Sequence, residues 1–189
     1  LKGLRKPYSP PMRRPWTLST KLGAIGGTLL LVALVSIGLT LWVTWQLEGG
    51  AAAVNEAGRM RMQTWRMAQT LARADAQQIA GLAAQFDQSV NVLRTGDPAR
   101  PLLVPHDALS QDAFAAVQRD WLELKARWTA LPGPGAELSG QQADAFVVRI
   151  DTFVSAIEHH LSRLTAILNA VQFVMVALTI GSAIALLYS

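Results

Sequence analysis

Two long apolar segments frame the chain. Residues 22–47 and 164–189 are each 26 residues long, and neither segment contains a charged side chain. Because about 20 apolar residues are enough to cross a bilayer, both segments are predicted to be transmembrane helices. A cleaved signal peptide is the alternative for the first segment, since basic residues precede it and Ala51-Ala52-Ala53 follows it. The apolar part of a signal peptide has only about 7–15 residues, which favours a membrane span.

The segment between the two spans has the periodicity of amphipathic helices. In its second half, apolar residues recur at steps of three and four. They are Phe114, Val117, Trp121, Leu124 and Trp128, and then Phe146, Ile150, Phe153, Ile157 and Leu161. Turn-forming residues interrupt the pattern at residues 96–105 and 132–135, where glycine and proline are concentrated. The predicted helices are therefore approximately 48–72, 75–95, 109–131 and 139–165.

Polar residues at the predicted helix starts support these boundaries. Asp75 with Gln78, and Ser139 with Gln142, have the spacing of a capping box, and Ser110 is a candidate cap for the third helix. Short connections favour antiparallel neighbours, with the first helix continuing the first span and the last helix entering the second. The predicted fold class is all-α, an antiparallel four-helix bundle flanked by two transmembrane helices.

The charges predict how the chain is oriented in a membrane. Six basic residues and no acidic residue precede the first span, whereas residues 46–165 contain 11 basic and 13 acidic residues. The positive-inside rule then places the N-terminus in the cytoplasm and the bundle outside it. Because the excess positive charge is confined to this tail, anionic membrane lipids are its expected partner, and no nucleic acid is expected. The predicted parts are a basic tail at 1–21, spans at 22–47 and 164–189, and a bundle at 48–163.

Residue types that carry catalysis or bind metals form no recognisable site. His106, His159 and His160 have no partners at a spacing suited to catalysis or to a metal, and the chain has no cysteine. Gly133 and Gly135 alternate with prolines, which suits a turn rather than a phosphate-binding loop. We therefore predict that this chain is non-catalytic and has no metal or cofactor. The second span reaches the last residue, so we expect a longer protein to continue beyond it.

The stretch NEAGRMRMQTWRM, residues 55–67, combines arginines with apolar residues on one predicted helix. One face of this helix contains Gly58, Arg61 and Trp65, and the adjoining face contains Arg59, Met62 and Arg66. Gly58 weakens the helix by about 1 kcal/mol relative to alanine, so a close approach of another backbone or of a ligand is expected there.

Two interpretations of these arginines remain open. They are solvated charges whose stems cover apolar surface, or their guanidinium groups bind a small planar oxyanion. In the second case a parallel dimer would bring two copies of Arg61 to its axis, where an anion would relieve their repulsion.

Residues 55–66 resemble the periplasmic motif N-x-A-G-x-x-R-M-Q-x-[aromatic]-R of the membrane-bound nitrate/nitrite sensor histidine kinases of Gram-negative bacteria. Residues 148–156 are similar to a second stretch of that family, on the last helix before the second span. Trp121 and Trp128 resemble aromatic positions of its third helix. The resemblance extends over the N-terminal sensor part and ends where a HAMP linker and a kinase would follow.

This resemblance implies a homodimeric sensor in the bacterial inner membrane with a periplasmic four-helix bundle. It implies that nitrate or nitrite is bound at the dimer interface by Arg61 of both subunits, with Gly58 and Met62 lining the pocket. The possible supporting residues are Asn55, Arg59, Trp65 and Arg66. The full-length protein would then be a histidine protein kinase whose partner is a cytoplasmic response regulator.

Two departures from the family pattern concern ligand preference. Glu56 stands where a lysine is common, and Arg59-Met60 stands where Ser-Leu is common. The type IV pilus chemoreceptor-like domains share the motif more loosely and are the alternative family, with another small ligand. A structural membrane bundle without a ligand is the third interpretation, in which Arg61 is replaceable without loss.

Overall fold

The computed structural model describes residues 18–73, 75–130 and 136–187. Within these ranges the chain forms four helices and no strand, which confirms the all-α prediction. They are α1 (Leu18–Leu71), α2 (Ala76–Thr95), α3 (Ala108–Ala130) and α4 (Ala136–Leu187). The basic tail, apart from its last few residues, and the predicted break at 132–135 lie outside the described residues.

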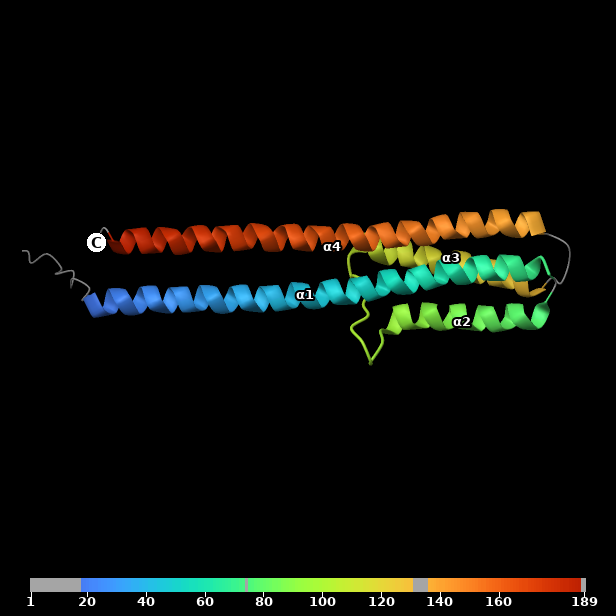
Figure 1. Cartoon of the computed structure of the whole chain (residues 1–189), viewed down its shortest axis with the longest axis horizontal. Coiled ribbons are helices and arrows are strands. Elements are labelled where there is room, and N and C mark those ends of the chain that lie inside the picture. Colours follow the sequence, from blue (N-terminus) through green and yellow to red (C-terminus); the bar gives the residue numbers. More distant parts are fainter. Residues whose placement is uncertain (1–17, 74, 131–135, 188–189) are drawn as a thin grey trace, which may run out of the picture.

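Two long helices and two short helices give the molecule its shape (Figure 1). The long helices α1 and α4 run side by side over the whole length, while α2 and α3 pack against them at one end only. As predicted, α1 continues without a break from the first apolar segment into the bundle, and α4 continues from the bundle into the second. Each long helix therefore links the bundle directly to the apolar half of the molecule.

The apolar halves of α1 and α4 have the properties of membrane spans. Each helix contains an 18-residue window of high mean hydropathy, 2.1 in α1 and 1.9 in α4, and none of either window is buried inside the protein. Such a surface requires a lipid environment, so the protein is membrane-bound. Between the spans, Gln172 Nε2 lies 3.4 Å from Thr40 Oγ1, which joins the two helices by a polar contact within the apolar region.

The bundle core is built from the apolar positions that the periodicity predicts. The residues buried along α3 include all five predicted positions, from Phe114 to Trp128. On α4, Phe146, Ile150, Phe153 and Ile157 are buried as predicted, and Leu161 packs against the edge of the core. The apolar stripes of α3 and α4 meet residues of α2 in an aromatic cluster. This cluster stabilises the packing of the helices against one another.

Two glycines allow close packing where the bundle meets the spans. A Cβ atom on Gly50 would lie 2.7 Å from the Leu161 side chain of α4, and one on Gly49 would lie 3.2 Å from Cβ of Leu103. The Leu103 N–H also donates a hydrogen bond to the Gly49 carbonyl oxygen, at 3.2 Å. The small residues thus let α4 and the α2–α3 connection approach the backbone of α1.

The predicted cap of α2 is confirmed. The Asp75 carboxylate accepts a hydrogen bond from the backbone N–H of Gln78, at 3.0 Å. The Gln78 side chain has a different role from the one that a capping box would give it, because its Oε1 lies 3.3 Å from the Thr70 hydroxyl of α1. This contact joins α1 to α2 across their connection.

The predicted cap of α3 was wrong by three residues. The helix begins at Ala108, and the Asp107 carboxylate accepts the hydrogen bond from the Ser110 backbone N–H, at 3.1 Å. Burial raises the pKa of Asp107, but hydrogen bonding, led by this N–H, outweighs burial and lowers it overall. Asp107 also faces His160 of α4, whose Nδ1 lies 2.9 Å from Oδ1, so His160 is paired rather than only solvated.

The predicted start of α4 at Ser139 was also wrong. The helix begins at Ala136, and Ser139 is a buried residue inside it, with its hydroxyl 3.5 Å from the Ala68 carbonyl oxygen of α1. Gln142, the expected second half of the capping box, accepts a hydrogen bond from Trp128 Nε1 at 2.9 Å. Both side chains therefore serve contacts between helices instead of a helix terminus.

Candidate functional site

Residues 55–67 divide into an inward face and an outward face of α1. The inward residues Met60 and Met67 are buried in the core. The outward residues, together called the motif face, are Asn55, Gly58, Arg59, Met62, Trp65 and Arg66. Asn55, Arg59 and Arg66 are exposed in the single chain, and Gly58 is half-buried. Met62 and Trp65 are 53% and 39% exposed, so two large apolar side chains lie uncovered outside the membrane spans.

Arg61 lies at the edge of the motif face and is paired with α4. Its Nη1 lies 2.6 Å from Oδ1 of Asp151, and both side chains are nearly half exposed, at 41% and 48%. The charge of Arg61 is therefore partly compensated within one chain, and the guanidinium group stays accessible from outside. The repulsion expected between two Arg61 side chains is correspondingly weaker than the sequence suggests.

Gly58 leaves room beside this guanidinium group. A Cβ atom built on Gly58 would meet only Nη2 of Arg61, at 3.9 Å, so no backbone of this chain approaches it closely. The close packing partner that the sequence predicts for Gly58 is absent from the described residues. Open space next to an accessible guanidinium group is the arrangement that a small ligand or a second copy of α1 would need.

Glu56 is a buried carboxylate held by two arginines. Only 2% of its side chain is exposed, and its Oε2 lies 3.2 Å from Arg59 Nη1 and 3.1 Å from Arg100 Nη2. Arg59 Nη1 donates this hydrogen bond from a position three residues later on the same helix. This pairing compensates Arg59 and leaves less positive charge on the motif face than its two arginines would supply.

Arg100 connects the α2–α3 connection to α1 and was not predicted. Its Nε lies 2.9 Å from Asp97 Oδ2, while its Nη2 bonds Glu56. The hydrogen bond from the Ala99 backbone N–H, followed by the one from Arg100, lowers the pKa of Asp97. Spacing along the chain offered no signal for this contact, because 44 residues separate Arg100 from Glu56.

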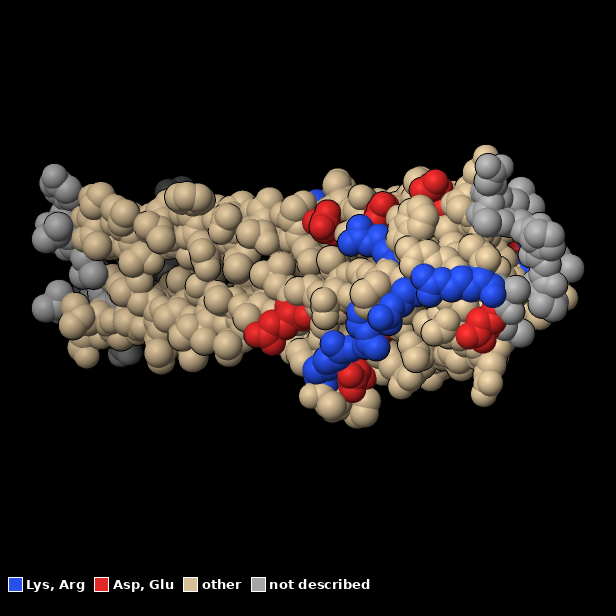
Figure 2. Space-filling model, turned by 45° about the vertical axis from the view of Figure 1, so that its right-hand side comes forward, with Lys and Arg blue, Asp and Glu red and all other residues tan. Residues whose placement is uncertain are grey.

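Positive side chains gather on the bundle and are absent from the spans. Figure 2 shows lysine and arginine side chains as a band along one face of the bundle, with acidic side chains at its margins. The apolar half of the same face shows no charged side chain. Anions that approach this face meet the band, whereas the spans present only apolar surface.

A comparison with known protein families shows which family the bundle belongs to. Residues 42–146, more than half of the chain, match the N-terminal region of type IV pili methyl-accepting chemotaxis transducers. The chain belongs to this family. The match begins in the first span, includes the whole motif face, α2 and α3, and ends within α4, before Asp151. No curated protein matches the chain. The chain is therefore a membrane-bound sensor module of this family.

Proposed function

We propose that this sensor binds nitrate or nitrite between two copies of α1 that pack through their motif faces. The observation that carries the proposal is the accessible guanidinium group of Arg61 beside the open space at Gly58. Met62 and Trp65 provide exposed apolar surface for contact with a second copy. The resemblance of residues 55–66 to the nitrate sensor motif supports the choice of ligand.

In this dimer, two Arg61 guanidinium groups would hold one planar anion. Forked N–H donors match two oxygens of a planar oxyanion, and hydrogen bonds to a charged acceptor are stronger than neutral ones. Met62 closes the pocket, and Asn55, Trp65, Arg59 and Arg66 act as supporting residues. Two positively charged side chains at the axis also make the dimer more stable with the anion than without it.

The Arg61–Asp151 pair supplies a route for the signal. An anion that binds Arg61 competes with the Asp151 carboxylate, which lies on α4. Because α4 continues into the second span, weakening this contact favours a different position of α4 relative to α1. The ligand can shift the balance between the two arrangements only by the difference in its affinity for them. We expect α4 to be displaced by about 1–2 Å relative to α1.

Two outputs are compatible with this sensor. The family match favours a methyl-accepting chemotaxis transducer. The motif at residues 55–66 and the stretch at 148–156 favour a histidine kinase with a response regulator as its partner. Incubating the full-length protein with labelled ATP separates them, because only the kinase would label itself on histidine.

We further propose that the bundle lies in the periplasm of a bacterial inner membrane and that the basic tail contacts anionic lipids in the cytoplasm. The excess of basic residues before the first span supports this orientation. Reporter fusions that place residues 50–160 in the cytoplasm would contradict it.

Anion selectivity tests the proposed ligand. Calorimetry on the full chain in lipid nanodiscs should show binding of nitrate or nitrite, weak competition by chloride and weak binding of sulfate. Chloride cannot accept forked hydrogen bonds at two oxygens, and sulfate is a tetrahedral dianion. Equal affinities for chloride and nitrate would show that the site recognises charge alone, and would reject the proposal.

Replacing Asp151 with asparagine should tighten nitrate binding. An exposed ion pair contributes only about 0.2–1 kcal/mol, so freeing Arg61 in both subunits should raise affinity roughly two- to thirtyfold. Asp120→Asn is the matched control, since Asp120 forms a similar exposed pair with Arg149, at 2.8 Å between α3 and α4. Affinity that is unchanged in Asp151→Asn, or raised equally in both variants, argues against competition at Arg61.

Nitrate should change the contact between the two spans. The chain has no cysteine, so Thr40→Cys with Gln172→Cys introduces one defined pair at the polar contact between the spans. We expect nitrate to alter the rate at which a short thiol-specific reagent cross-links this pair in membranes. The same pair combined with Arg61→Ala should not respond. Equal rates with and without nitrate would reject the displacement while leaving the binding site intact.

Variants that uncouple binding from transmission should map to the contact between α1 and α4. Ile150 and Phe153 of α4 are fully buried in the bundle core, so we expect them to belong to this contact, and neither lies on the motif face. Smaller apolar residues at these positions should reduce the nitrate response of the cross-linking rate more than they reduce nitrate affinity.

A further inference from the structure

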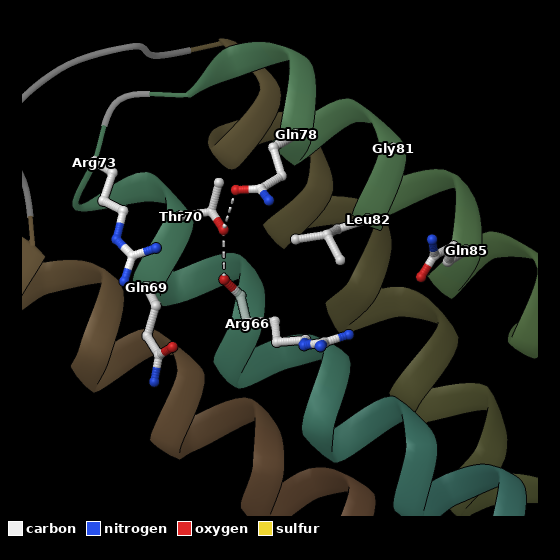
Figure 3. Close-up of a pocket in the computed structure, with 8 residues that line it drawn as sticks. All are labelled: Arg66, Gln69, Thr70, Arg73, Gln78, Gly81, Leu82 and Gln85. Atoms are coloured by element: carbon white, nitrogen blue, oxygen red, sulfur yellow. Dashed lines mark hydrogen bonds between the residues drawn. The ribbon is translucent and has the colours of Figure 1, made fainter.

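A polar pocket lies at the end of the bundle farthest from the spans. Its volume is about 490 Å³, and it opens between the C-terminal end of α1, which lies far from the spans (Figure 1), and the first half of α2 (Figure 3). The residues that line it are Arg66, Gln69, Thr70, Arg73, Gln78, Gly81, Leu82 and Gln85. A volume of this size is typical of sites for organic molecules and exceeds what a single nitrate ion would fill.

Within the part of the chain that the structure describes, no carboxylate compensates the positive charge of this pocket. Among the described residues, Arg66 and Arg73 form no ion pair, unlike Arg59 and Arg61 of α1. No acidic residue belongs to the lining, which adds three glutamine amides, Gln69, Gln78 and Gln85, as further hydrogen-bonding groups. The two guanidinium groups are therefore available to an anionic ligand, and the amides are available to its polar atoms.

The arrangement of the charges indicates the chemical class of the ligand. Arg66 lies near the end of α1, whereas Arg73 lies in the turn beyond Leu71, where the helix ends, so the two arginines line the pocket from separate positions. A ligand with two separated anionic groups can contact both guanidinium groups. A single small anion can contact both of them only if the two arginine side chains converge. An amino acid fits poorly, because the lining offers no carboxylate for its ammonium group.

Gly81 and Leu82 complete the pocket. A Cβ atom on Gly81 would meet nothing within 4 Å, so the glycine keeps this wall open although it weakens the helix. The Leu82 side chain points toward the space between the helices and provides an apolar wall (Figure 3). A short carbon chain between two carboxylates would contact such a wall.

We propose that this pocket, with Arg66 and Arg73 as its charged residues, binds a small organic dicarboxylate in each subunit. The pocket shares Arg66 with the motif face, but the proposal can be tested separately from nitrate binding, because Arg73 and Gly81 do not belong to that face. The pocket lies between α1 and α2, so a bound dicarboxylate would stabilise the contact between these two helices at the end of the bundle farthest from the spans.

Calorimetry on the full chain in zwitterionic lipid nanodiscs tests the proposal, with succinate and malate as probes. At least one dicarboxylate should bind, and acetate and glutamate should bind at least about tenfold more weakly. Arg73→Gln should weaken dicarboxylate binding by at least about tenfold and leave nitrate affinity unchanged. Failure of both dicarboxylates to bind, or equal binding of glutamate, would overturn the assignment.

A steric pair of variants separates binding in the pocket from binding elsewhere on the positive surface. Gly81→Phe should abolish dicarboxylate binding by filling the pocket, whereas Gly81→Ala should preserve it, because the added methyl group meets open space. Circular dichroism of Gly81→Phe checks that the helices remain formed. If Gly81→Phe is folded and binds dicarboxylate like the wild type, the ligand does not occupy this pocket and the proposal fails. If Gly81→Phe does not fold, Arg73→Gln decides the same question.

Discussion

Replacing Arg61 with alanine is expected to weaken nitrate binding by more than a hundredfold. A hydrogen bond to a charged group contributes about 1.5–3 kcal/mol, and the substitution removes Arg61 from both subunits. The combined loss of about 3–6 kcal/mol corresponds to a factor of roughly 10² to 10⁴ in the dissociation constant. Titration calorimetry of the wild type and the variant in nanodiscs measures this change directly.

Two further variants make the Arg61 result specific. Arg119→Ala removes an exposed arginine of α3 that forms no ion pair among the described residues, so it changes the net charge equally and should leave affinity nearly unchanged. Arg61→Lys keeps the charge without the forked donors and should bind nitrate with intermediate affinity. Equal nitrate affinity in Arg61→Ala and the wild type would favour the interpretation of a structural bundle without a ligand.

The largest expected effect on stability comes from Phe86→Ala. Phe86 of α2 is fully buried, with its ring centroid 4.0 Å from that of Trp121 and 5.6 Å from that of Phe146. These contacts join α2 to α3 and α4. Truncating a buried phenylalanine costs about 3–5 kcal/mol through lost burial and the remaining cavity, so the bundle should unfold at a clearly lower temperature.

Circular dichroism in nanodiscs measures the unfolding of Phe86→Ala. Leu122→Ala is the matched control, because Leu122 of α3 is 67% exposed and its truncation should change stability by no more than about 0.5 kcal/mol. Equal melting temperatures of Phe86→Ala and Leu122→Ala would show that the aromatic cluster does not hold α2 in the bundle.

The helices and the core could be predicted because their signals are local. The apolar stripe from Phe114 to Trp128 recurs with the helical period, and every predicted position of it is buried. Helix starts were less predictable. Ser110 and Asp107 are both good capping residues, and the contact of Asp107 with His160 lies outside any local pattern.

The site was predicted in part, for a physical reason. The motif placed Arg59, Arg61 and Arg66 on the surface of one helix, but their partners depend on how α1 lies against other elements. Asp151 is 90 residues from Arg61 and Arg100 is 44 residues from Glu56, so no spacing rule connects them. These partners determine which arginines remain available to an anion.

The distal pocket was missed, although the sequence contains a usable signal. Arg59, Arg66 and Arg73 recur every seven residues; the first two lie on one side of α1, and Arg73 follows just beyond the end of this helix. Only Arg59 has an acidic residue nearby on the same helix, three positions earlier at Glu56. The direction in which α2 returns along α1 is set by tertiary packing, so the glutamines of α2 that complete the pocket could not be assigned from the motif.

The number of nitrate ions bound at saturation tests the central claim most directly. Calorimetry on the full-length chain in nanodiscs, with the chain concentration known, measures this number for the wild type. A site formed by Arg61 of two subunits predicts one nitrate for every two chains. One nitrate per chain, or no binding at all, would contradict a shared site at the dimer axis.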